Sequence, residues 1–226
     1  MSFQIADRKQ VWGCIFLSLA LGAVLAVGFQ PTANEGMQWV LSFLNCQSSG
    51  LCILLEKTAF PLLALFFFIS LPQPLYPHPS PLGTKRLWTL SILPILIASL
   101  YGSFKSISLE NWKEAYWTWL AIPLGEEFLF RGWLTALLNR IYRGKLGGAT
   151  PLFPLSLWGS SLAFAVWHLQ NGFSAPLAPV LFQVFYTFFA GIWLGFLRWN
   201  TGKVWPCVLA HFLINFAADW KLWFMI

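Results

Sequence analysis

Three short clusters with polar side chains interrupt hydrophobic stretches in the second half of the chain. In order along the sequence they are Glu126, Glu127 and Arg131; Phe164 and His168; and His211 and Asn215. A charged side chain at the centre of a bilayer costs about 2.5–3.5 kcal/mol on the insertion scale. Charges in such surroundings therefore indicate groups that pair with one another or take part in a reaction.

The first cluster divides its charges between two helix faces. On an α-helix, Glu127 and Arg131 are four residues apart, so their side chains share a face and can form an ion pair. Glu126 is turned by about 100° from Glu127, which leaves it facing the interior of a helix bundle. A carboxylate in that place is a candidate general base. The alternative is that all three groups only pair with other polar groups and hold helices together.

The second and third clusters contribute imidazole and carboxamide groups. A lone histidine such as His168 is more often a hydrogen-bonded packing residue than a catalyst, and Phe164, one turn earlier, is expected to set the position of its ring. His211 and Asn215 are four residues apart and share a helix face, which places two hydrogen-bond donors side by side, as an oxyanion site requires. The same pair also suits a polar contact between membrane helices.

The composition is that of a membrane protein. Of the 226 residues, 58% are hydrophobic and 10% are charged, whereas a soluble domain carries about 25% charged residues. We predict an all-α, polytopic transmembrane helix bundle of about seven spans (six to eight), because about 20 apolar residues cross a bilayer. The expected spans are 11–29, 51–71, 87–101, 112–138, 152–169, 176–197 and 204–224. A shorter stretch at 37–44 is expected to lie along the surface or form an extra turn.

The chain is expected to be one integral-membrane domain over residues 1–226. Residues 1–111, which carry none of the clusters, would form N-terminal helices, and residues 112–226 would form a catalytic core that holds all three clusters. Counting 1.5 Å per residue from the expected helix ends puts the clusters at broadly one level. The motif-bearing helices are therefore predicted to form a central polar cavity.

Charge and cysteine placement bear on topology and partners. Lysines and arginines gather in alternate loops, which predicts a cytoplasmic N-terminus; these residues are Arg8, Lys9, Lys85, Arg86, Arg140, Arg143, Lys145, Arg198 and Lys203. The net charge of +6 comes without a basic stripe or recognition motif, so we expect lipid and no nucleic acid as partner. Cys14 and Cys207 are interpreted as packing residues. Cys46 and Cys52 flank one loop and would form a disulfide in an oxidising compartment.

The clusters resemble the signature of the CPBP intramembrane protease family, which includes type II CAAX prenyl endopeptidases and bacteriocin-processing or immunity proteins. The family pattern is EExxxR, then FxxxH, then HxxxN, on separate transmembrane helices. The chain matches it in order and spacing over about residues 112–220. Size and helix number resemble the bacterial branch, which implies an integral protein of the bacterial plasma membrane.

The resemblance implies a reaction and a role for each residue. Glu126 and His168 would activate a water that attacks a peptide carbonyl, and His211 with Asn215 would stabilise the resulting oxyanion. Three further residues are expected to support the site: Glu127, Arg131 and Phe164.

Metal dependence is a separate question, because one glutamate and two histidines suffice for a zinc site with an open position for water. The alternative ligands would be Glu126, His168 and His211. The chain lacks the HExxH helix of soluble metalloproteases. We expect a glutamate-type enzyme without a cofactor and keep a divalent metal such as zinc as the alternative.

The leading interpretation is an intramembrane endopeptidase that cleaves a membrane-associated protein or peptide. The alternative is a non-catalytic membrane immunity or partner protein of the same fold. A transporter or proton relay is a third reading, since intramembrane glutamate and histidine also mark ion paths, but the sequence shows no inverted repeat. A prenylated tail, a propeptide and a bacteriocin precursor all stay open as substrates.

Overall fold

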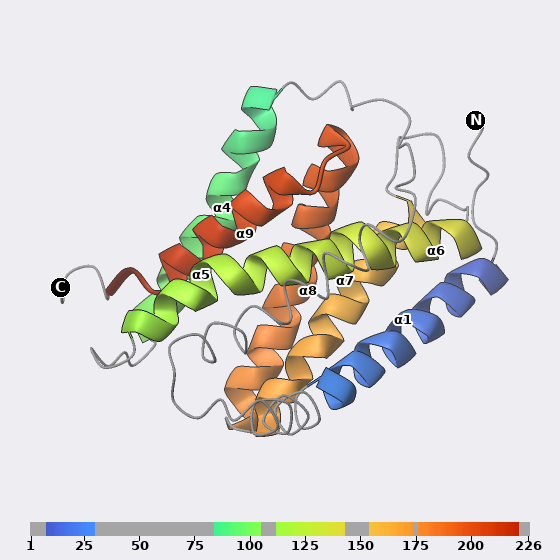
Figure 1. The fold of residues 1–226 in the computed structure, drawn as a ribbon, viewed down its shortest axis with the longest axis horizontal. Helices are drawn as coiled ribbons and strands as arrows, with labels where there is room; N and C mark the ends of the chain where they lie inside the picture. Colours follow the sequence, from blue (N-terminus) through green and yellow to red (C-terminus); the bar gives the residue numbers. More distant parts are fainter. Residues whose placement is uncertain (1–7, 30–83, 105–111, 143–153, 174–175, 222–226) are drawn as a thin grey trace, which may run out of the picture.

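The computed structural model describes residues 8–29, 84–104, 112–142, 154–173 and 176–221, and nearly all of them are helical (Figure 1). The elements, in chain order, are α1 (Arg8–Phe29), α4 (Thr84–Phe104), α5 (Trp112–Glu127), the π-helix η2 (Phe128–Leu134), α6 (Thr135–Ile141), α7 (Leu155–Trp167), the 3₁₀-helix η3 (His168–Phe173), α8 (Leu177–Thr201) and α9 (Trp205–Ala218). The all-helical class predicted from the sequence is confirmed for these residues.

The number of membrane spans stays a prediction. Within the described ranges, two helices are long and apolar enough to cross a bilayer, Arg8–Leu25 and Leu177–Thr201. Two shorter apolar helices, Ser91–Leu100 and Trp205–Ala218, accompany them. The expected span 51–71, the stretch 37–44 and the cysteine pair Cys46 and Cys52 lie outside the described residues.

The expected helix 112–138 forms as one continuous rod made of α5, η2 and α6, which crosses α7 and α8 in Figure 1. The expectation of a regular α-helix throughout is wrong for residues 128–134, which are π-helical. The hydroxyl of Thr135 donates to the carbonyl of Phe130, five residues earlier, at 2.7 Å. Four consecutive residues, Leu129 to Gly132, are buried here, more than one face of a regular helix would cover.

The second motif helix ends earlier than the sequence indicated. α7 stops at Trp167, and His168 opens the 3₁₀-helix η3 instead of continuing an α-helix to residue 169. A 3₁₀-helix is tighter than an α-helix and often follows its last turn. His168 is therefore placed at the junction between two kinds of helix.

Arg198 departs from its expected place in a cytoplasmic loop. It lies in the last turns of α8 with 2% of its surface exposed. Its Nε donates to the carbonyl of Arg131 at 3.3 Å, and its Nη1 donates to the carbonyl of Gly202. This arginine therefore joins α8 to the π-helix.

Small residues let α8 and α7 approach closely enough to hold the polar clusters together. A Cβ built at Gly191 would lie 2.9 Å from Nη2 of Arg131 and 3.1 Å from Cβ of Ser161. A Cβ at Gly195, one turn later, would meet Leu157 at an ordinary 3.5 Å. The two glycines therefore differ in how much room they leave, although they share one helix face.

We predict that Gly191→Ala destabilises the protein by about 1–3 kcal/mol, because the added methyl group forces a shift in a packed core. Gly195→Ala is the matched control and should be neutral or stabilising, since alanine is favoured over glycine in a helix by about 1 kcal/mol. Thermal unfolding of the purified variants in detergent measures both. Equal unfolding temperatures for the two variants would contradict this account of the packing.

Candidate active site

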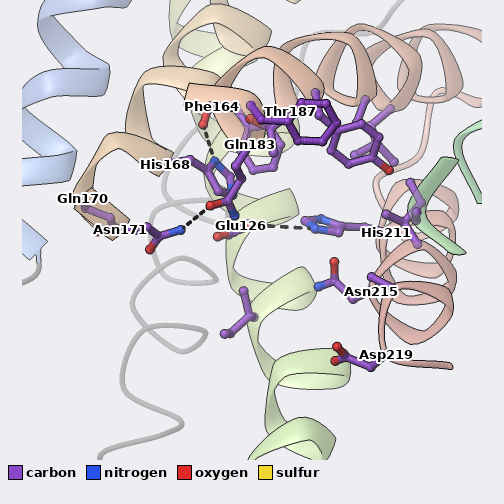
Figure 2. A pocket seen from close by; sticks show the side chains of 18 residues that line it. Glu126, Phe164, His168, Gln170, Asn171, Gln183, Thr187, His211, Asn215 and Asp219 are labelled. Atoms are coloured by element: carbon purple, nitrogen blue, oxygen red, sulfur yellow. Dashed lines mark hydrogen bonds and ion pairs between the residues drawn. The ribbon is translucent and has the colours of Figure 1, made fainter. Parts of the chain in front are cut away.

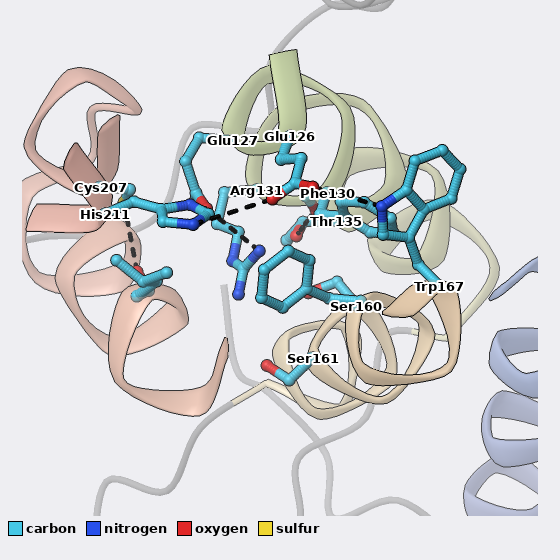
Figure 3. A network of polar contacts seen from close by, with 12 residues as sticks. Glu126, Glu127, Phe130, Arg131, Thr135, Ser160, Ser161, Trp167, Cys207 and His211 are labelled. Atoms are coloured by element: carbon cyan, nitrogen blue, oxygen red, sulfur yellow. Dashed lines mark hydrogen bonds and ion pairs between the residues drawn. The ribbon is translucent and has the colours of Figure 1, made fainter. Parts of the chain in front are cut away.

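Glu127 lies at the centre of a buried charged network (Figure 3). Its Oε1 accepts a hydrogen bond from Nη1 of Arg131 at 3.3 Å, and both side chains have no exposed surface. The ion pair expected from the sequence is therefore present. The same oxygen also accepts a hydrogen bond from Nδ1 of His211 at 2.8 Å, which joins residues 84 positions apart. The sequence did not reveal this second partner, because the pair with Arg131 already gave Glu127 a counter-charge.

The Glu127 contact fixes the orientation of the His211 ring. With Nδ1 donating to Glu127, the other ring nitrogen, Nε2, lies 3.8 Å from Oε2 of Glu126. A carboxylate therefore faces each of the two ring nitrogens of His211, Glu127 at Nδ1 and Glu126 at Nε2. A carboxylate that holds one nitrogen of an imidazole sets the tautomer and direction of the ring, as in hydrolase triads.

Glu126 is buried, with 5% of its surface exposed. Its Oε1 accepts a hydrogen bond from the indole Nε1 of Trp167 at 3.2 Å, and its Oε2 is the atom that faces His211. A buried indole N–H needs an acceptor, and here it holds one carboxylate oxygen in place. Trp167 was not among the predicted residues, although its position directly before His168 was a usable signal.

His168 presents one ring nitrogen as an acceptor. Its Nδ1 lies 2.8 Å from the carbonyl of Phe164. Because a carbonyl only accepts, Nδ1 carries the hydrogen, and Nε2 of the neutral ring is left with a lone pair. The backbone of its own helix therefore sets the tautomer of His168.

Phe164 contacts more of the site than a packing neighbour of His168 would. Its ring meets the rings of His168 and His211 edge to face, with centroids 4.7 and 5.8 Å away. The guanidinium carbon of Arg131 lies 4.2 Å from the centre of the same ring, a cation–π contact. This phenylalanine packs between Arg131 and the two imidazoles and so helps to fix where both rings lie.

The four predicted catalytic residues line one cavity of about 360 Å³: Glu126, His168, His211 and Asn215 (Figure 2). They come from α5, the start of η3 and α9. Phe164 also lines the cavity, whereas Glu127 and Arg131 do not. The common level estimated from helix lengths therefore corresponds to a shared space, with the ion pair behind its wall.

Other polar residues that the sequence analysis did not single out line the same cavity: Gln170, Asn171, Gln183, Thr187 and Asp219. Asp219 follows Asn215 by four residues, the same interval that separates Asn215 from His211. This spacing in the sequence could have identified Asp219 as a third residue on the same helix face. Its Oδ2 accepts a hydrogen bond from the indole of Trp119 at 2.9 Å. The apolar wall includes Ile122, Phe182 and Ile214.

The cysteines and the alternative metal ligands can also be placed. Cys14 and Cys207 are buried, unbonded to each other and packed as expected, each with its thiol on a backbone carbonyl. Among the described residues, no three or more histidine, cysteine, aspartate or glutamate side chains gather closely enough to hold a metal ion. The alternative ligand set of Glu126, His168 and His211 shares the cavity without forming such a group.

A comparison with family profiles gives one match. Residues 108–217 match the family described as type II CAAX prenyl endopeptidase Rce1-like. A search of curated proteins and a search of solved structures returned no match. The matched segment covers about half of the chain and includes all three clusters. This family implies a membrane protease that acts on a membrane-associated protein or peptide. The chain therefore belongs to the CPBP family of intramembrane proteases.

Proposed function

We propose that the protein is a glutamate-type intramembrane endopeptidase, which hydrolyses a peptide bond with a water held between Glu126 and His168. The observation that carries this proposal is the cavity in which these two side chains meet His211 and Asn215. A scaffold protein would have no need of an acid, two imidazoles and a carboxamide around one space. The non-catalytic alternative is therefore less well supported.

The water would be bound by two acceptors. Nε2 of His168 has a lone pair because Nδ1 is held by the carbonyl of Phe164, and Oε2 of Glu126 is left for the cavity because Oε1 is held by Trp167. A water that donates one hydrogen to each acceptor turns its own lone pair outward. Glu126 would take the proton as the water oxygen attacks the carbonyl carbon, a step that typically contributes 10²–10⁴-fold.

The oxyanion would be received by His211 and Asn215. Donation from Nε2 of His211 requires a proton on both ring nitrogens, because Nδ1 already donates to Glu127. The carboxylates of Glu127 and Glu126 stabilise that positive charge. The Nδ2 group of Asn215 supplies a second donor from the same face of α9. When the tetrahedral intermediate collapses, the C–N bond breaks, and Glu126 returns its proton to the leaving amine.

The arrangement suits a reaction without a metal. If His211 carries the second proton that the oxyanion role requires, Arg131 and His211 balance the charges of Glu126 and Glu127, and the cluster is neutral without a further cation. Buried charges that are not balanced in this way are costly.

We predict that Glu126→Gln and His168→Ala abolish detectable cleavage, because each removes one of the two groups that hold the water. Asn215→Ala should leave residual activity reduced by about 10²–10³-fold, as for loss of one oxyanion donor. Purified protein in liposomes would first be incubated with a membrane proteome, and new termini mapped by mass spectrometry would supply peptide substrates. Robust cleavage by Glu126→Gln would overturn the proposal.

We predict that Glu127→Gln lowers kcat by about 10²–10⁴-fold, because an amide has the shape of the carboxylate but does not stabilise a protonated imidazole. The variant should also be less stable than the wild type, since the buried Arg131 loses its counter-charge. Single-turnover rates with saturating peptide measure the effect, and thermal unfolding in detergent verifies the fold. A kcat within a few-fold of the wild-type value would show that the Glu127–His211 contact is structural only.

Cleavage should survive removal of divalent metal ions. The test is activity of protein prepared under exhaustive chelation and analysed for bound metal by mass spectrometry. Undiminished turnover is expected, since the proposed water is held by protein groups alone. If chelation stops the reaction and added zinc restores it, Glu126, His168 and His211 would instead be assigned as ligands.

A further inference from the structure

We propose that Gln183 positions the substrate by donating a hydrogen bond to a backbone carbonyl of the bound peptide, other than the scissile one. This inference rests on the proposed endopeptidase function and assigns a role to a residue outside the three family motifs. Gln183 lies on α8, lines the same cavity as Glu126 and His168, and is half-buried.

The amide group of Gln183 is held in a defined orientation. Its Oε1 accepts a hydrogen bond from Nδ2 of Asn171 at 2.8 Å. Asn171 belongs to η3, three residues after His168. Within the described part of the chain this is the only hydrogen bond of the Gln183 side chain. Because the oxygen is the acceptor, the Nε2 group with its two N–H donors is the end left for a ligand.

The ligand that fits is a peptide carbonyl. A peptide bond can be hydrolysed only where the substrate backbone is unwound, and each N–H or C=O group freed from a helix in the membrane costs several kcal/mol without a new partner. A protease that works in this medium must therefore supply partners for the unwound backbone. An amide N–H recognises a backbone carbonyl whatever the side chain of that residue is.

The location of Gln183 separates it from the oxyanion site. In the view of Figure 2, Asn171, which holds the amide of Gln183, lies on one side of Glu126, and His211 and Asn215 lie on the other. The scissile carbonyl oxygen is assigned to His211 and Asn215. A peptide that extends from there across Glu126 brings a different carbonyl to Gln183. The contact would therefore stabilise the bound substrate and the transition state equally.

The test uses two substitutions that distinguish positioning of the substrate from a purely structural link between η3 and α8. Gln183→Met removes both the donors and the bond to Asn171 at similar volume, whereas Gln183→Glu keeps an oxygen for Asn171 and removes the donors. Both should raise KM about tenfold, as expected for loss of a hydrogen bond that leaves a buried partner unpaired. For Gln183→Met the kcat should stay within about twofold, since binding shared by both states is lost. Peptides of unrelated sequence should show the same KM increase.

Thr187→Val is the matched control. Thr187 lines the same cavity one turn along α8, but its hydroxyl donates to the carbonyl of Val184 within the helix at 3.2 Å. Its KM should stay within about twofold of the wild-type value, because no donor to the substrate is removed. Thermal unfolding in detergent is measured for each variant.

Three outcomes would overturn the inference. The first is an unchanged KM in Gln183→Met. The second is wild-type behaviour of Gln183→Glu beside an impaired Gln183→Met, which would make the pair a tether between η3 and α8. The third is a fall in kcat without a change in KM, which would make Gln183 a donor to the transition state.

Binding measured without turnover keeps this inference separate from the proposed function. In the Glu126→Gln background, the Kd of a fluorescent substrate peptide should rise about tenfold when Gln183→Met is added. An unchanged Kd overturns the role of Gln183 alone. Cleavage by Glu126→Gln overturns the proposed function whatever the Kd shows.

Discussion

The site depends on the hydrogen bonds that the buried carboxylate of Glu127 accepts. One oxygen of this group holds Arg131 on its own helix and His211 on α9. Arg131 also covers the ring of Phe164 on α7, and its backbone carbonyl accepts from Arg198 on α8. Four helical segments therefore meet at the Glu127–Arg131 pair, and a change at Glu127 would affect contacts to α7, α8 and α9, which all line the cavity.

Burial explains why this network specifies geometry more than it adds stability. Two ions removed from water lose hydration that their attraction only partly repays, whereas removing one partner leaves an uncompensated charge at a cost of about 3–5 kcal/mol. Within the described residues, Nε and Nη2 of Arg131 and Oε2 of Glu127 have no hydrogen-bond partner. The network thus forgoes some hydrogen bonds and still fixes the direction of the His211 ring. This favours a role in the reaction over a purely structural contact between helices.

Much of the site followed from spacing in the sequence. Four-residue intervals placed Glu127 beside Arg131. Helix rise predicted that the three clusters would lie near one another, and residues from each of them line one cavity. The periodicity could not show that residues 128–134 form a π-helix or that His168 begins a 3₁₀-helix. Both depend on packing between elements, since a local pattern is compatible with either helix type. Contacts across helices, such as Trp167 with Glu126 and Asn171 with Gln183, were hidden for the same reason. Arg198 was expected in a loop because a charge near a helix end suggests one, but it lies in α8 and donates to the carbonyls of Arg131 and Gly202.

The most direct test of the central claim is an experimental structure of the Glu126→Gln variant with an uncleaved peptide bound. The account predicts that the scissile carbonyl oxygen lies within hydrogen-bond distance of Nε2 of His211 and Nδ2 of Asn215. A water should lie between residue 126 and His168, and His211 should still contact Glu127. A peptide bound outside this cavity, or an imidazole of His211 turned away from Glu127, would contradict the account.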